Sequence, residues 1–402
     1  MKSFKGWQQI AATMLMQAAS SGSIFISYSV IAGPLQQSFA PSRTLLMMAI
    51  TAVLIGSGVL SPLLGRTMER VSLKRLMIVG ASSLGLGFIA LSQSQSMPQV
   101  LLVYLIAMSL SSVLCGPIAG SALLARWFNK RRGLAMSLSA AGAAVGGLIA
   151  PPLLQFLIEQ FSWRTALFGY GLGLLALLIP MLTLLIIDRP EQVSQFPDGA
   201  DSAPEQNAQQ TAQPGLGFYL GDRNFWLIAI ILGLLFASSM GITANLLQYV
   251  AEQGMDAASG AVLLSIFAGA NFVGKLGSGV AADKFNPRAL LAGIIIVFGS
   301  AVLCFAQLPI YGVFVAASAL LGVSQGAIVP LWSVMMARFY GPDRVGSSMG
   351  MMSLLLTPFN LVAAPAFGYV FDSTGSYVNA YMTCAALMLL GLALVSLIRE
   401  SK

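Results

Sequence analysis

The chain has 402 residues, of which 57% are hydrophobic and only 9% are charged, and its mean hydropathy is +0.81. Soluble globular domains carry about 25% charged residues, so this chain could not cover its surface in water. These values exclude a soluble enzyme, a nucleic-acid-binding protein and a disordered protein as descriptions of the whole chain. They predict a polytopic membrane protein, and the long continuous apolar runs favour helices over a membrane β-barrel.

Twelve apolar runs are long enough to cross a membrane as helices, which need about 20 residues each. In chain order they lie at roughly 9–33, 45–64, 76–95, 99–124, 134–157, 165–187, 224–250, 258–281, 289–307, 310–335, 346–370 and 378–398. We therefore expect an all-α membrane protein with twelve transmembrane helices. The first run is too long for the apolar core of a signal peptide, so we assign it as the first transmembrane helix.

Lysine and arginine side chains gather in alternate connections, and this distribution predicts the orientation of the chain. With the N-terminus in the cytoplasm, 18 of the 21 basic residues fall on the cytoplasmic side, and the exceptions are Arg43, Arg164 and Lys275. We therefore expect a multi-pass protein of the inner (cytoplasmic) membrane of the cell, with both termini in the cytoplasm. The net charge of +7 follows from this topology and does not indicate binding to nucleic acid.

The composition changes abruptly over residues 188–223, which are rich in Pro, Gln, Ala, Asp and Glu. A segment with so few large apolar side chains cannot bury enough surface to fold alone. We predict an N-terminal six-helix bundle at 1–187, a cytoplasmic linker at 188–223 and a C-terminal six-helix bundle at 224–402. A plain tether is favoured for the linker, and a regulatory role stays open.

The two predicted bundles repeat short patterns at a nearly constant offset. The residues Ala125–Phe128 match Ala337–Tyr340 after 212 residues, and Ala150-Pro151 matches Ala364-Pro365 after 214. Because six helices separate the copies, the repeats are parallel and related by an axis along the membrane normal. Secondary transporters use this arrangement and bind their substrate near mid-membrane at the interface of the repeats.

The loop after the second apolar run reads Gly65-Arg-Thr-Met-Glu69-Arg70, and a second copy reads Gly279-Val-Ala-Ala-Asp283-Lys284. Both resemble the signature loop of the major facilitator superfamily, Gly-x-x-x-Asp-Arg, with Glu69 in place of the usual Asp. The resemblance implies the major facilitator fold and a cytoplasmic latch made by these glycines and charged residues together with Arg126. A carboxylate there can meet a helix N-terminus while its basic neighbours pair with other groups. The alternative interpretation is a positive-inside loop with an incidental acid.

Four further segments resemble the monocarboxylate porter and oxalate:formate antiporter group. They are Tyr28–Arg43, the basic loop Arg126–Gly133, the small-residue run Ala140–Gly147 and the stretch Gly368–Tyr377. This resemblance implies a secondary active transporter of small organic anions, monocarboxylates such as lactate or pyruvate, working as a proton symporter or an anion exchanger by alternating access.

Lys275 is the one charged residue inside the core of a predicted helix. It lies eight residues before Asp283, which places it about 12 Å from the cytoplasmic end of the helix. Such a lysine costs about 2.5–3.5 kcal/mol on insertion and usually marks a transport path, whereas a lysine reaching back to the headgroups is the alternative. The resemblance implies that Lys275 binds the substrate carboxylate and that Asn271 takes the place of a proton-coupling acid.

Other candidate substrate-binding residues lie on helices that line the path in this fold: Tyr28, Tyr104, Gln248, Trp332 and Asn360. Their aromatic and amide groups could enclose the apolar body of a carboxylate and bond its second polar end, although interhelical packing explains each of them equally well. No catalytic residue, cofactor or metal site is expected, because the chain has no histidine and its three cysteines lie far apart. We expect a monomer in the lipid bilayer whose partners are a carboxylate anion and either protons or a counter-anion.

Two rival functions stay open. An exporter of amphipathic drugs or metabolites with the same fold would tolerate neutralisation of Lys275. A sensor that signals through residues 188–223 would bind ligand without transporting it. An enzyme is not expected, since no nucleophile, acid pair or metal set clusters at the helix ends.

Overall fold

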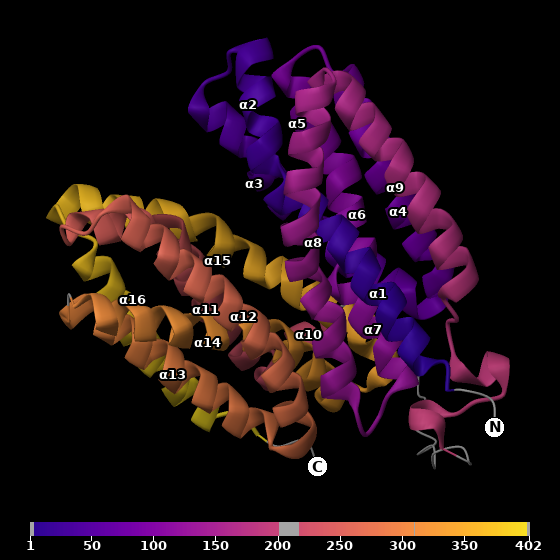
Figure 1. Cartoon of the computed structure of the whole chain (residues 1–402). Helices are drawn as coiled ribbons and strands as arrows, with labels where there is room; N and C mark the ends of the chain where they lie inside the picture. Colours follow the sequence, from indigo (N-terminus) through magenta and orange to yellow (C-terminus); the bar gives the residue numbers. More distant parts are fainter. Residues whose placement is uncertain (1–3, 201–216, 309, 400–402) are drawn as a thin grey trace. The chain divides into compact units, whose positions relative to one another are not determined.

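The structure is a computed structural model that describes residues 4–200, 217–308 and 310–399 (Figure 1). Every regular element in these three ranges is a helix. Twelve helices or continuous helix series within them are long and apolar enough to cross a membrane. The predicted all-α architecture with twelve spans is therefore confirmed.

The chain packs as two compact units. Unit 1 comprises Met1–Gln213 and Met336–Leu354, and unit 2 comprises Pro214–Met335 and Leu355–Lys402. Two helices, α14 (Tyr311–Tyr340) and α15 (Val345–Thr374), therefore contribute to both units. The bundle boundaries at 187 and 224 that the sequence suggests stay a prediction.

Unit 1 holds the first six spans. Four of them are the unbroken helices α3 (Arg43–Arg70), α4 (Leu73–Gln93), α8 (Arg132–Gln160) and α9 (Trp163–Leu185). The first span runs through α1 (Gly6–Ser21), the π-helical turn η1 (Gly22–Ile26) and α2 (Tyr28–Phe39). The fourth runs through α5 (Met97–Val103), the π-helical turn η2 (Tyr104–Met108), α6 (Ser109–Leu114) and α7 (Pro117–Trp127).

Glycines bring the helix backbones of unit 1 together. α1 lies along α8 and α4 lies along α9 (Figure 1). A Cβ atom on Gly146 of α8 would overlap the carbonyl group of Ala18 in α1, and one on Gly142 would overlap that of Met14. Small residues of this kind are the usual means of close helix packing in a membrane, where burial of apolar surface provides no driving force.

Unit 2 contains α11 (Arg223–Glu252), α12 (Ala257–Lys284), α13 (Pro287–Gln307) and α16 (Val378–Ser396), with the short α10 (Gly217–Leu220) before them and parts of α14 and α15. Buried aromatic rings join these helices: the centroids of Tyr249 and Tyr381 lie 4.3 Å apart, and those of Phe305 and Phe314 lie 4.7 Å apart. Asp256 caps α12, and hydrogen bonds from the Ser259 side chain and backbone hold the pKa of Asp256 below its usual range.

Within unit 2, α12 and α14 cross in direct backbone contact. A Cβ atom on Gly274 would overlap the carbonyl of Val323, and Cβ atoms on Gly322 and Gly326 would overlap those of Phe267 and Asn271. The crossing therefore depends on three residues without side chains. It fixes Asn271 and Lys275 of α12 against the middle of α14.

The crossing predicts unequal effects of two alanine substitutions. Gly326→Ala should force α14 away from α12, an overpacking that typically costs about 1–3 kcal/mol, and the Tm of the purified protein should fall. Gly277→Ala is the matched control, because a Cβ on Gly277 of α12 meets no atom within 4 Å. Equal Tm values for the two variants would contradict the close contact.

Candidate functional site

Lys275 places a positive charge in the middle of a membrane span. Its side chain is half-buried in α12. Among the described residues its ammonium group has neither a carboxylate nor a hydrogen-bond partner, while its main-chain carbonyl accepts a hydrogen bond from Ser278 Oγ at 3.0 Å. An ion in a low-dielectric environment is costly unless an opposite charge neutralises it. The site is therefore suited to an anion.

Two amide side chains meet one helical turn before Lys275. Asn271 Nδ2 of α12 donates to Gln325 Oε1 of α14 at 3.1 Å. Asn271 and Lys275 are four residues apart and so lie on one face of α12. We name Lys275, Asn271 and Gln325 the α12–α14 cluster, and the last two the amide pair.

Trp332 lies two helical turns after Gln325 on α14. Its indole Nε1 is buried and has no hydrogen-bond partner among the described residues. The indole packs edge-on against Phe236 of α11, with ring centroids 6.3 Å apart. The α12–α14 crossing thus brings Gln325 to Asn271 and its neighbour Lys275, and Trp332 follows on the same face of α14 as Gln325.

Two other candidates in unit 2 are not joined to this cluster by the contacts of the described residues. Gln248 has an exposed side chain on α11. Asn360 Nδ2 donates to the carbonyl of Leu356 in its own helix at 3.2 Å. Their role in substrate binding stays a prediction.

The two tyrosine candidates lie together in unit 1. The rings of Tyr28 and Tyr104 are buried edge to face, with centroids 5.4 Å apart. The Tyr28 hydroxyl donates to the carbonyl of Leu46, whereas the Tyr104 hydroxyl is buried without a partner in the described part of the chain. Tyr104 is the first residue of the π-helical turn η2, and Tyr28 follows η1 after Ser27. Such turns are frequent at functional positions, and no pattern of residues predicted either turn.

The first copy of the signature loop contacts the beginning of α15, and both belong to unit 1. Glu69 Oε1 accepts a hydrogen bond from the Ser347 backbone N–H at 3.3 Å, in the first turn of α15. Gly65 of α3 meets Gly346 backbone to backbone. Arg126 Nη2 donates to the carbonyl of Met68 at 2.9 Å. A carboxylate at this position stabilises the positive end of the helix dipole.

The remaining charged latch candidates are at the surface. Arg70 ends α3 with an exposed side chain. In the second copy, Gly279 is buried in α12, while Asp283 and Lys284 are exposed in its last turn. This second copy belongs to unit 2.

Residues 186–200, which we name the strap, fold against the end of unit 1 where α1 begins. They contain the 3₁₀ turns η3 (Pro190–Val193) and η4 (Pro197–Gly199). Asp198 Oδ2 accepts the backbone N–H groups of Asn129 and Lys130 at 2.9 and 2.7 Å. Asp188 Oδ1 accepts that of Lys74 at 2.8 Å. This part of the predicted linker is therefore folded, and residues 201–216 lie outside the described residues.

An ion pair connects the strap to the turn before α15. Arg189 Nη2 lies 3.3 Å from Asp343 Oδ1 in the 3₁₀ turn η5 (Pro342–Arg344), which also belongs to unit 1. Both side chains are about half exposed, at 48% and 50%. An exposed pair of this kind contributes at most about 1 kcal/mol. The ion pair therefore orients the strap more than it stabilises it.

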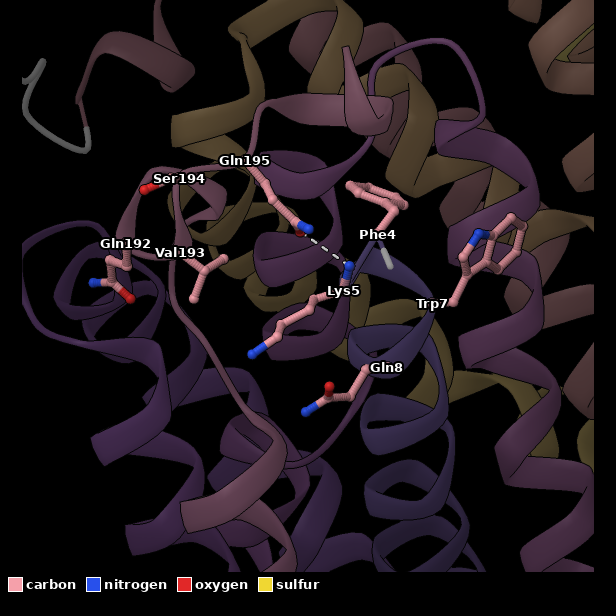
Figure 2. A pocket seen from close by; sticks show the side chains of 8 residues that line it. All are labelled: Phe4, Lys5, Trp7, Gln8, Gln192, Val193, Ser194 and Gln195. Carbon is pink, nitrogen blue, oxygen red and sulfur yellow. Dashed lines mark hydrogen bonds between the residues drawn. The ribbon is translucent and has the colours of Figure 1, made fainter. Parts of the chain in front are cut away.

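A surface cavity of about 680 Å³ lies between the strap and the start of α1 (Figure 2). Figure 2 shows the Lys5 and Gln8 side chains on one side of it and Gln192 and Val193 on the other. The Lys5 backbone N–H donates to Gln195 Oε1 at 3.0 Å and closes one end. None of the predicted substrate-binding residues lines this cavity.

A family model, sequence relatives and a solved structure all indicate the same protein family. The Major Facilitator Superfamily model matches residues 13–354 and 238–402. The chain is 25% identical over 308 residues to monocarboxylate transporter 12 of Rattus norvegicus, covering 70% of this chain but only 62% of the rat protein, which is less than two thirds of its length. It is 28% identical over 345 residues to monocarboxylate transporter 11 of Mus musculus, covering 82% and 73%. The fold is similar to the crystal structure of FucP, a Major Facilitator Superfamily transporter in the outward conformation, with a TM-score of 0.72 and 15% identity over 97% and 99% of the two chains.

The contacts of Asp198 predict that it anchors the strap. Asp198→Ala removes the acceptor for the N–H groups of residues 129 and 130, so these amides and those of the strap should exchange faster in hydrogen–deuterium exchange. Glu191→Ala is the matched control, since Glu191 lies exposed in the same strap. Unchanged exchange in the Asp198 variant would show that the apolar packing of the strap holds it without this carboxylate.

Proposed function

Because the chain belongs to the Major Facilitator Superfamily and is a secondary transporter, we propose that it carries small organic anions, monocarboxylates such as lactate or pyruvate among them, by alternating access. The observation that carries this proposal is the unpartnered ammonium group of Lys275 in the middle of α12. A substrate carboxylate would supply the missing negative charge. The names of the two monocarboxylate transporters that the chain resembles support the same substrate class.

A lysine binds such an anion as a point charge. It lacks the planar two-pronged donor set of arginine, so it attracts a carboxylate without fixing its orientation. Orientation would then come from neighbouring groups, and the amide pair lies one helical turn away on the same face of α12. Lys275 therefore provides affinity for the substrate carboxylate, and its neighbours orient the substrate.

We also propose anion exchange as the mode of coupling. Acidic residues of unit 2 lie at or beyond helix ends in the described ranges: Asp222, Glu252, Asp256, Asp283 and Asp372. An empty transporter would have to change conformation with the Lys275 charge unneutralised, which is unfavourable in a low dielectric. A bound anion removes that cost in both directions, so exchange is faster than one-way transport.

We propose that the protein lies in the inner membrane with both termini in the cytoplasm. The basic residues in alternate connections favour this orientation. In this orientation Glu69, Arg126 and the strap lie on the cytoplasmic side. We propose that the contact of Glu69 with the start of α15 stabilises the state closed to the cytoplasm.

Neutralising Lys275 tests the substrate class. In proteoliposomes, Lys275→Gln should reduce the uptake of labelled lactate by about tenfold or more, since a hydrogen bond to a charged group is worth about 1.5–3 kcal/mol. Lys275→Arg should retain part of the activity. The matched control is Lys130→Gln in the exposed loop before α8, which should transport like the wild type.

Full uptake by Lys275→Gln would show that the site does not depend on a cation. If that variant also carried neutral or cationic amphipathic compounds, the exporter would be the correct function. Binding of carboxylates without any uptake by the wild type would instead support a sensor.

The mode of coupling needs a separate measurement. Proteoliposomes containing trapped unlabelled lactate should take up labelled lactate much faster than empty ones, because the returning step then carries an anion. An imposed pH gradient across empty vesicles should give little uptake. Rapid uptake driven by the gradient alone would establish proton symport and contradict exchange.

A further inference from the structure

The amide pair beside Lys275 has unused hydrogen-bonding groups. Each primary amide side chain carries one carbonyl oxygen and one NH₂ group. The bond between Asn271 and Gln325 uses one carbonyl oxygen and one N–H. Among the described residues, the other carbonyl oxygen and the other NH₂ group have no partner. The pair therefore presents one free acceptor on Asn271 and one free donor on Gln325 at the α12–α14 crossing.

This result does not depend on how the amides are oriented. If both amides were turned over, Gln325 would donate to Asn271 in place of the reverse. The free carbonyl oxygen would then belong to Gln325 and the free NH₂ group to Asn271, so one acceptor and one donor would still be left. Both side chains are half-buried, so neither is sealed inside the helix packing.

We infer that the amide pair makes the transporter selective for carboxylates that carry a hydroxyl group next to the carboxyl, the 2-hydroxy acids. This inference rests on the proposed function, in which Lys275 binds the carboxylate. A hydroxyl group both donates and accepts hydrogen bonds, so it satisfies the free carbonyl oxygen and the free NH₂ group together. Gln325 of α14 is thus a specificity-determining residue.

Closely related acids would satisfy the pair less well. A 2-oxo acid can accept from the NH₂ group but leaves the free carbonyl without a donor. An unsubstituted carboxylate leaves both groups without partners once the site is closed to water. Sites built to bond a substrate hydroxyl reject analogues that lack it, because their polar groups are then left unpaired. The expected order of affinity is 2-hydroxypropanoate, then 2-oxopropanoate, then propanoate.

Competition in proteoliposomes tests this order. The uptake of labelled 2-hydroxypropanoate by the wild type is measured with unlabelled 2-hydroxypropanoate, 2-oxopropanoate or propanoate as inhibitor. We expect propanoate to need at least about a tenfold higher concentration for half-inhibition, because one unsatisfied group alone produces a loss of that size and propanoate leaves two. Gln325→Leu should reduce the preference to about twofold, by weakening 2-hydroxypropanoate alone. Gln307→Leu, an exposed residue at the end of α13, is the matched control and should keep the wild-type preference.

Equal inhibition of the wild type by propanoate and 2-hydroxypropanoate would overturn the selectivity while leaving anion transport intact. If Gln325→Leu keeps the full preference for 2-hydroxypropanoate, the amide pair does not cause that preference. If Gln325→Leu does not fold, Gln325→Ala provides the same comparison. The selectivity itself is tested by the order in which the three acids inhibit the wild type, which requires no variant. Failure of all three acids to inhibit or to be transported would instead contradict the proposed function.

Discussion

The architecture depends on direct backbone contact between helices at glycines. Helices in lipid satisfy their own hydrogen bonds and gain little from burying apolar surface against each other, so close packing has to supply the attraction. Gly142 and Gly146 bring α8 onto α1, and Gly326 brings α14 onto α12. The same contact that holds two helices together also fixes which polar side chains face each other across them. The amide pair forms because the glycine contacts prevent α14 from shifting along α12, which keeps Gln325 opposite Asn271.

Much of this fold could be predicted from the sequence, because apolar runs of membrane-spanning length are a strong signal. All twelve spans were expected. Lys275 was also identifiable, since a charge inside an apolar run is rare. Gln325 was not singled out in the same way, because an amide in an apolar helix is as compatible with packing as with binding. Only its contact with Asn271 distinguishes it.

Two other features lay beyond sequence reasoning. The π-helical turns beside Tyr28 and Tyr104 arise from a local change of hydrogen-bond partner, which leaves no pattern in the residues of η1 and η2. Most of the strap was predicted to belong to a cytoplasmic linker at 188–223 that cannot fold alone, because that segment has few large apolar residues. The strap is folded nonetheless, since two carboxylates, those of Asp188 and Asp198, bind backbone N–H groups of the bundle.

The way in which the strap is held has an evolutionary consequence. Asp198 bonds main-chain groups, and every residue except proline offers the same N–H donor at positions 129 and 130. The side chains there are free to change without loosening the strap. Methods that infer contacts from pairs of covarying positions would therefore find no partner for position 198. The contact would be invisible to them although it joins two segments far apart in the chain.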